Sequence, residues 1–176
     1  MDAYLVSIGI VVLIYALLAI GLNLQYGETG LINFGHVAFF AIGAYTSALL
    51  SLKGISLWLT FPAAAVVAGL AAIPLGMAAL RLREDYLAIV TLGFSETTRL
   101  VIQQEEWLTR GVQGLPGIPA LFASAGTSTR NLLQLGLLVC VVAAAIAAVK
   151  LLQKSAFGRL LRAIRDNEPA VTAIGK

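Results

Sequence analysis

The sequence has little charge and few of the residues from which catalytic and metal sites are usually built. Its 176 residues include one cysteine, Cys140, and one histidine, His36. A single cysteine excludes a disulfide within the chain and a cysteine-rich metal site. The sequence also contains no G-x-x-x-x-G-K-[ST] phosphate loop, so any ATP hydrolysis is expected on another chain. We therefore predict a protein that is not an enzyme and that has no metal or other cofactor.

Charged residues make up 12% of the chain and hydrophobic residues 59%. A soluble domain usually has about a quarter of its residues charged. Here long blocks have no charge at all, which indicates several membrane spans rather than one soluble core. The net charge of +3 comes from cations beside the apolar blocks, so it does not indicate a nucleic-acid partner. The expected surroundings are a lipid bilayer.

Five apolar blocks predict an all-α, polytopic membrane helical bundle with about five spans. Most are about twenty residues long, which matches the ~30 Å hydrocarbon core. The predicted spans lie near residues 5–24, 31–52, 57–80, 86–104 and 132–149. Prolines inside the third span, Pro62 and Pro74, predict kinks. We divide the chain into this bundle, residues 1–152, and a basic amphipathic segment, residues 153–176.

Lysine and arginine in short loops predict the orientation of the spans. Arg81 and Arg83 follow the third span and five further cations follow the fifth, so both places are assigned to the cytoplasm. This assignment puts the N-terminus and the loop 105–130 outside, and a short polar break at 25–29 inside. Seven of the cations agree with this scheme and three disagree. The first apolar block lacks a basic leader and a cleavage site, so we expect it to be retained as a span.

Polar side chains inside the apolar blocks mark a candidate solute path, because lipid cannot satisfy them. Glu96 and Arg99 lie three residues apart on one helix face and predict an ion pair. The pair can be structural, can snorkel to the outer interface, or can lie beside the path. His36 can contact a solute or relay protons, although a hydrogen bond between helices is its more ordinary role. The residues assigned to the candidate path are Asn23, Asn33, His36, Tyr45, Glu96 and Arg99.

Small residues recur every fourth position in two of the predicted spans. Such seams let helix backbones approach closely in lipid, and we expect both to pack within the subunit. The first seam consists of Ala64, Ala68, Ala72 and Gly76, and the second of Gly136, Cys140, Ala144 and Ala148.

The basic tail predicts a short amphipathic helix, a break at Pro169 and a second short helix. Leu160, Leu161 and Ile164 form an apolar stripe with cations beside it. This pattern suits docking into a groove on a cytoplasmic partner. It also suits a helix that lies on the inner leaflet of the membrane. The sequence leaves both interpretations open.

Two stretches of the chain resemble the membrane permease of branched-chain amino acid ABC importers, the LivM type. They are LNLQYGETGLINFGHVAFFAIGAYTSALL and LRLREDYLAIVTLGFSETTRLV. The loop LTRGVQGLPGIP and the tail SAFGRLLRAIRDNEPAVTAIG resemble the same family in the same order. Glu84 and Pro169 depart from its pattern. Members of the family continue through further spans where this chain stops at Lys176, so we expect the chain to be truncated, with only the N-terminal part of a permease.

The resemblance implies a permease subunit of the bacterial inner membrane that imports branched-chain or related amino acids by alternating access. It implies a second permease subunit, cytoplasmic ABC ATPase subunits and a periplasmic amino-acid-binding protein as partners. It further implies that the tail is the ATPase coupling segment, with Arg159, Arg162, Arg165, Asp166, Glu168 and Gly175 in contact. Two alternatives remain. One is an ion-coupled secondary transporter that uses Glu96, Arg99 and His36, and the other is a membrane scaffold or permease fragment that transports nothing.

Overall fold

A computed structural model describes residues 2–79, 84–122 and 126–173. All regular secondary structure in these ranges is helical, which confirms the predicted all-α class. The chain forms two compact units, residues 1–32 with 124–176 and residues 33–123. Each unit packs its own helices. Arg81 and Arg83, which the predicted orientation uses, lie outside the described residues.

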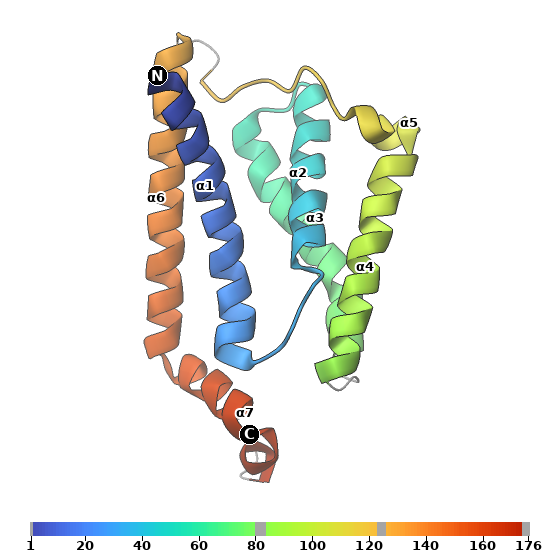
Figure 1. The fold of residues 1–176 in the computed structure, drawn as a ribbon, viewed down its shortest axis with the longest axis vertical. Coiled ribbons are helices and arrows are strands. Elements are labelled where there is room, and N and C mark those ends of the chain that lie inside the picture. Colours follow the sequence, from blue (N-terminus) through green and yellow to red (C-terminus); the bar gives the residue numbers. More distant parts are fainter. Residues whose placement is uncertain (1, 80–83, 123–125, 174–176) are drawn as a thin grey trace. The chain divides into compact units, whose positions relative to one another are not determined.

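The first unit is built on two long helices, α1 (Asp2–Leu22) and α6 (Thr127–Lys154), which lie side by side (Figure 1). Gly9 allows their close approach, since a Cβ there would lie 3.0 Å from Leu135 Cδ1. The two helices run in the same direction, because Gln153 near the end of α6 reaches Glu28, just beyond α1. Because the two helices are parallel, residues 28–30 after the first helix and α7 after α6 lie at the same end of this unit. The predicted orientation requires the same arrangement.

The first helix continues through the polar break that the sequence predicts at residues 25–29. A π-helical turn, η1 (Asn23–Gly27), extends α1. Thr29 Oγ1 donates a hydrogen bond to the Gln25 carbonyl (2.5 Å), so the polar residues satisfy the helix backbone instead of interrupting it. The helix ends at Gly30, whose φ of +75° favours glycine. The prediction of a break at 25–29 was wrong for this reason.

The tail turns at Ser155 from α6 into α7 (Ala156–Ala173). Ser155 Oγ accepts a hydrogen bond from the Gly158 N–H (3.1 Å). Two residues before Pro169, the backbone of Asn167 leaves the helical region. Asn167 Oδ1 then accepts the Ala170 N–H (3.1 Å), as a helix N-cap does. The predicted sequence of helix, break and second helix is confirmed as far as Ala173.

The second unit contains three longer helices and two short turns. They are α2 (His36–Leu52), α3 (Leu57–Ala79), α4 (Glu84–Gln104), α5 (Glu106–Thr109) and the 3₁₀ turn η2 (Gly111–Gln113). Helix α2 begins at His36, whereas the sequence predicts that this span begins at residue 31. Asn33 Oδ1 accepts the Gly35 N–H (2.8 Å) in a turn that precedes the helix. The Phe34 N–H donates to Thr91 Oγ1 (3.1 Å), which fastens this turn to α4.

Helices occupy all five predicted spans within the described residues. Three are long and apolar enough to cross a bilayer, over Tyr4–Gly27, Leu57–Ala78 and Thr129–Lys154. Helix α2 is apolar but has 17 residues. Helix α4 has 21 residues and carries Glu96 and Arg99. These helices make the chain a multi-pass membrane protein. The division into a bundle, 1–152, and a cytoplasmic segment, 153–176, stays a prediction.

The two predicted small-residue seams have different outcomes. On α3, Ala64 and Ala68 face Gly43 of α2, where an added Cβ would lie 3.9 Å from Ala68 Cβ. On α6, α1 packs near Leu135, and the packing within the subunit that the sequence predicts for the seam stays a prediction. All four residues of the α6 seam, Gly136, Cys140, Ala144 and Ala148, are exposed.

A hydroxyl pair joins α2 to α3 and gives a first testable prediction. Thr60 is fully buried, and its Oγ1 lies 2.9 Å from Ser47 Oγ. Thr60→Val keeps the shape of the side chain but leaves the Ser47 hydroxyl without this partner. We expect a loss of about 1 kcal/mol of unfolding free energy, the scale of hydrogen bonds between membrane helices. Thermal unfolding in detergent measures it. Thr97→Val, at an exposed position on α4, is the control and should change nothing.

Candidate functional site

A cavity of about 320 Å³ lies between α2, α4 and the loop that follows α5, within the second unit. Its size is at the small end of the range for small-molecule sites. Four of its lining residues, Ala38, Ala41, Gly111 and Gly114, have small or no side chains, so the space is not filled from within. The remaining lining residues are apolar (Val37, Ile102, Val112) or polar (Tyr45, Ser95, Thr98, Arg99, Gln103).

Arg99 is the cationic group of this cavity, and two neighbours on α4 fix its orientation. Its Nε donates to Glu96 Oε2 (2.9 Å), and its Nη2 lies 2.8 Å from the same oxygen. Its Nη1 donates to Gln103 Oε1 (3.0 Å). The predicted Glu96–Arg99 pair is therefore formed. Because both side chains are 54% exposed, the pair adds little to stability, and its effect is to hold the guanidinium in place.

The loop wall of the cavity is tied to α4 by Thr109. This residue is buried, and its hydroxyl donates to the Ile102 carbonyl (2.6 Å). The chain then turns at Gly111, with φ of +60°. A Cβ at Gly111 would lie 2.9 Å from the Gln103 carbonyl oxygen, so glycine is required for this approach. The loop is thus held against the polar end of α4.

The predicted path residues divide between the two units. Tyr45 and Arg99 line one cavity, and Glu96 is paired with Arg99 and holds its guanidinium in place. Asn33 belongs to the turn before α2. His36 is the first residue of α2; its side chain is half-buried and has no hydrogen bond within the described ranges. Asn23 lies in η1 of the other unit and is exposed. The structure therefore brings together three of the six predicted residues.

Three polar residues of the cavity were missed by the sequence analysis. Ser95, Thr98 and Gln103 line the cavity together with Arg99 on α4. Counted from Ser95, the other three residues follow at helical spacings of three, four and eight. That periodic polar stripe is visible in the sequence and could have identified them. The contribution of Gly111 and Gly114 could not be predicted, because it depends on how the loop folds back.

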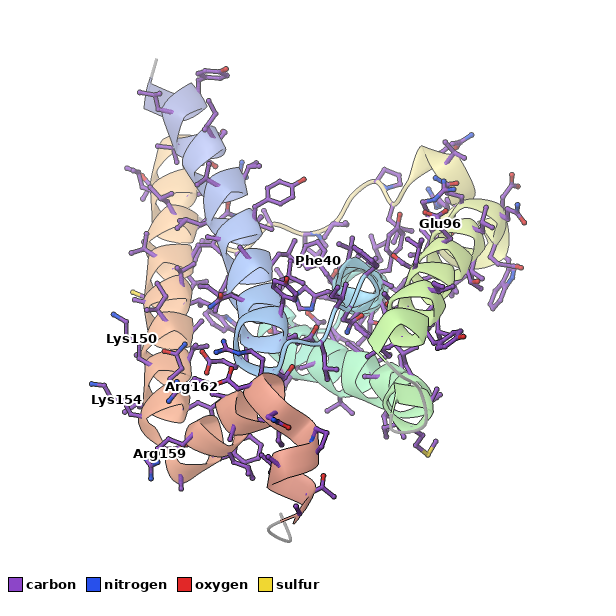
Figure 2. The ribbon with its side chains drawn as sticks, turned by 60° about the horizontal axis from the view of Figure 1, so that its bottom comes forward. Phe40, Glu96, Lys150, Lys154, Arg159 and Arg162 are labelled. Atoms are coloured by element: carbon purple, nitrogen blue, oxygen red, sulfur yellow. The ribbon has the colours of Figure 1, made fainter. Side chains whose placement is uncertain are left out.

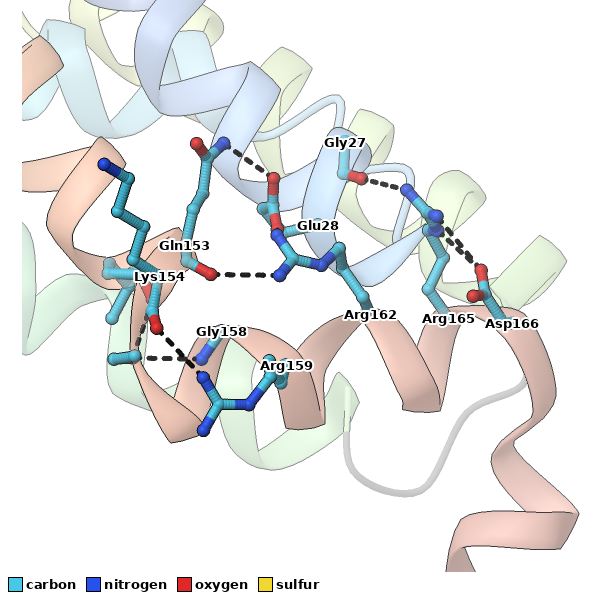
Figure 3. Close-up of polar contacts among 11 residues, drawn as sticks. Gly27, Glu28, Gln153, Lys154, Gly158, Arg159, Arg162, Arg165 and Asp166 are labelled. Atoms are coloured by element: carbon cyan, nitrogen blue, oxygen red, sulfur yellow. Dashed lines mark hydrogen bonds and ion pairs between the residues drawn. The ribbon is translucent and has the colours of Figure 1, made fainter.

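A second polar cluster joins α7 to the end of the first helix (Figure 3). Glu28 is buried, and its two carboxylate oxygens have different partners. Oε1 accepts from Gln153 Nε2 (2.7 Å), and Oε2 pairs with Arg162 Nη1 (3.3 Å). Arg162 Nη2 also donates to the Gln153 carbonyl (3.0 Å). We call Glu28, Gln153 and Arg162 the α1–α7 junction.

Arg165 adds a second attachment one turn further along α7 (Figure 3). Its Nη1 donates to the Gly27 carbonyl at the end of η1 (2.6 Å). A Cβ on Gly30 would lie 3.0 Å from Arg165 Cγ, so the two segments are in close contact. Gln25 Oε1 in the same turn is buried with no hydrogen-bond partner among the described atoms. Helix α7 therefore contacts a π turn that contains a side-chain oxygen without a described hydrogen-bond partner. Such π turns are often found at functional sites.

The remaining cations of this region point away from α1. Lys150, Lys154 and Arg159 are exposed, and Figure 2 shows them on one side, whereas Arg162 lies between α6 and α1. Arg159 Nη1 donates to the Lys154 carbonyl (3.0 Å). These three cations form an exposed basic face at the bend between α6 and α7.

The predicted coupling residues therefore have different surroundings. Arg162 and Arg165 face the first helix, and Asp166 pairs with Arg165 (3.0 Å). Arg159 is turned outward. The side chain of Glu168 and all of Gly175 lie outside the described residues. The contact between Glu28 and Arg162 was not predicted from the sequence, because 134 positions separate them and no local pattern connects them.

No metal site is evident in the part of the chain that the structure describes. Among those residues, no group of three or more histidine, cysteine, aspartate or glutamate side chains is placed to share an ion.

Comparison with known proteins gives a family and two close relatives. Residues 4–176 match the family described as the permease component of the branched-chain amino acid transport system. The high-affinity branched-chain amino acid transport system permease protein LivM of Escherichia coli strain K12 is 44% identical over 115 residues. The protein of the same name from Salmonella typhimurium strain LT2 has the same identity over the same length. These alignments cover 65% of this chain and 27% of each relative, so the match spans about a quarter of their length. No solved structure matches.

Proposed function

Because this chain belongs to the family of branched-chain amino acid permease components, we propose that it is the membrane permease subunit of an ATP-driven importer of branched-chain or related amino acids. The observation that carries the proposal is the family match over residues 4–176, which includes the helices of both units and α7. In this role the chain performs no covalent chemistry. Its partners are a second permease subunit, cytoplasmic ATPases and a periplasmic amino-acid-binding protein.

In the proposed mechanism, the conformational change of the ATPases acts first on α7. The N-terminus and the loop 105–130 lie outside, and residues 153–176 lie in the cytoplasm of a bacterial cell, where the ATPases dock on the exposed side of α7. Movement of α7 then reaches the first helix through the α1–α7 junction, since Glu28 and Gly27 are its direct contacts. A ligand shifts such an equilibrium only if it binds the two states with different affinity. Closure of the ATPases on ATP supplies this difference.

Retention of the ATPase subunits during purification tests the proposal. We expect the tagged permease to retain them in mild detergent at near-equal amounts. Permease that never retains an ATPase, under conditions that preserve related complexes, would contradict it.

Arg159 gives a more local prediction about the docking face. Its side chain is exposed and points away from α1, so it is available to an acidic partner surface. Arg159→Glu should reduce ATPase retention at least about fivefold, because a repulsive charge replaces an attractive one at the interface. Quantitative immunoblotting of the purified complex measures it. Lys53→Glu, in the turn between α2 and α3 that we assign to the outside, is the matched charge reversal. Equal retention by both variants would argue against docking at this face.

A further inference from the structure

The cavity of the second unit combines one held cation with an apolar wall. We infer that it is a binding site for a small aliphatic carboxylate, with the α-carboxylate of a branched-chain amino acid on Arg99. This inference rests on the proposed function and adds a site to it. Three features support it: the free donors of Arg99, the composition of the cavity walls and the position of the cavity beside the second half of α4.

Arg99 retains donors that point to no neighbour in the described part of the chain. A guanidinium has five N–H groups, one on Nε and two on each terminal nitrogen. Glu96 engages Nε and Nη2, and Gln103 engages Nη1. One N–H therefore remains on each terminal nitrogen, and two such donors match the two oxygens of a carboxylate. Because Glu96 and Gln103 already hold the guanidinium, little side-chain freedom is lost when a ligand binds.

The other walls of the cavity fit the rest of such a ligand. Val37 and Ile102 offer an apolar surface to a short branched side chain. Tyr45, Ser95 and Thr98 carry hydroxyl oxygens that can accept hydrogen bonds from an ammonium group. The volume of about 320 Å³ limits the ligand to a small molecule.

The position of the cavity also suits delivery of a solute from outside. Arg99 and Gln103 lie in the second half of α4, which runs towards the loop 105–130. The proposed orientation puts that loop outside. An amino acid released by the binding protein would meet this cavity before it passes between the helices.

Equilibrium binding to the purified permease–ATPase complex, without the binding protein, tests the inference. The probe is radiolabelled L-leucine. The competitors are 4-methylpentanoate, which lacks the ammonium group, and 3-methylbutylamine, which lacks the carboxylate. We expect the acid to compete and the amine to compete at least about tenfold more weakly, since only the acid can bind Arg99. Equal competition by the two, or no leucine binding at all, would overturn the inference.

Two variants test the cavity by different means. Arg99→Gln removes the cation, and Ala41→Leu fills the space without changing any charge. Each should weaken leucine binding at least about tenfold, and Lys53→Gln, which lies outside the cavity, should not change it. If Arg99→Gln fails to fold, Ala41→Leu still decides the matter. Wild-type affinity in a folded Ala41→Leu complex would overturn the assignment.

Uptake by the complete transporter separates this inference from the proposed function. If the wild type imports leucine with ATP and both variants bind leucine normally, the cavity assignment is wrong and the proposed function stands. If the wild type does not import any branched-chain amino acid with ATP, the proposed function itself fails.

Discussion

Arg162→Glu is expected to lower transport at least about tenfold, and the double variant Glu28→Arg/Arg162→Glu to recover much of the loss. Removing the partner of a buried charge leaves that charge uncompensated, and such changes typically cost 3–5 kcal/mol. The Glu28 side chain is only 10% exposed, but that of Arg162 is 38% exposed, so we expect a cost of about 2–3 kcal/mol. The reversal puts two carboxylates in contact and detaches α7 from the first helix. The exchanged pair restores opposite charges at the same place.

The measurement is ATP-dependent uptake together with retention of the ATPase subunits. Because Arg162 belongs to the α1–α7 junction and not to the exposed basic face, retention should fall less than uptake does in the single variant. Arg159→Glu provides the control, since it reverses a charge on the same helix without an acidic partner in the described structure. Adding Glu28→Arg to Arg159→Glu should rescue nothing. Failure of the exchanged pair to recover more uptake than this control would show that the junction does not transmit movement.

Gly158→Ala is expected to have the other large effect, although it adds only one methyl group. A Cβ at Gly158 would lie 2.8 Å from Gln153 Cα, and it would also collide with the Leu152 carbonyl oxygen. Both are backbone atoms that cannot rotate away, so the bend between α6 and α7 has to open. Opening the bend moves α7 away from Glu28. Overpacking of this kind typically costs 1–3 kcal/mol.

We expect Gly158→Ala to lose most ATPase retention and uptake while it still inserts in the membrane. Insertion is preserved because the residue lies beyond the apolar span Thr129–Lys154. The matched control is Gly136→Ala on α6, where an added Cβ meets no atom within 4 Å. Equal behaviour of the two alanine variants would contradict the account of the bend.

The helices and the broken tail could be predicted from the sequence because their signals are local. Long apolar blocks predict the helices of the five spans, and Pro169 predicts the break that the backbone makes at Asn167. The start of α2 was predicted too early, since Asn33 acts in a turn and not in a helix. The π turn was missed because glycine and polar residues between two spans usually indicate a loop.

The α1–α7 junction and the cavity show where such prediction ends. The α1–α7 junction brings Glu28 together with Gln153 and Arg162, which lie 125 and 134 residues further along the chain. These contacts depend on how α1 packs on α6. The polar stripe on α4 is readable from helical spacing, but the hollow beside it is not. That space exists because Ala38, Ala41 and Gly111 leave it open. Small residues on a membrane helix indicate close packing just as well.

The most direct test is uptake of labelled leucine into proteoliposomes that contain the complete transporter and its binding protein. We expect accumulation when ATP is present on the ATPase side and no ion gradient is imposed. We expect no accumulation with an ion gradient alone. Uptake that proceeds without ATP and collapses with the ion gradient would contradict the proposed ATP-driven import and favour an ion-coupled transporter.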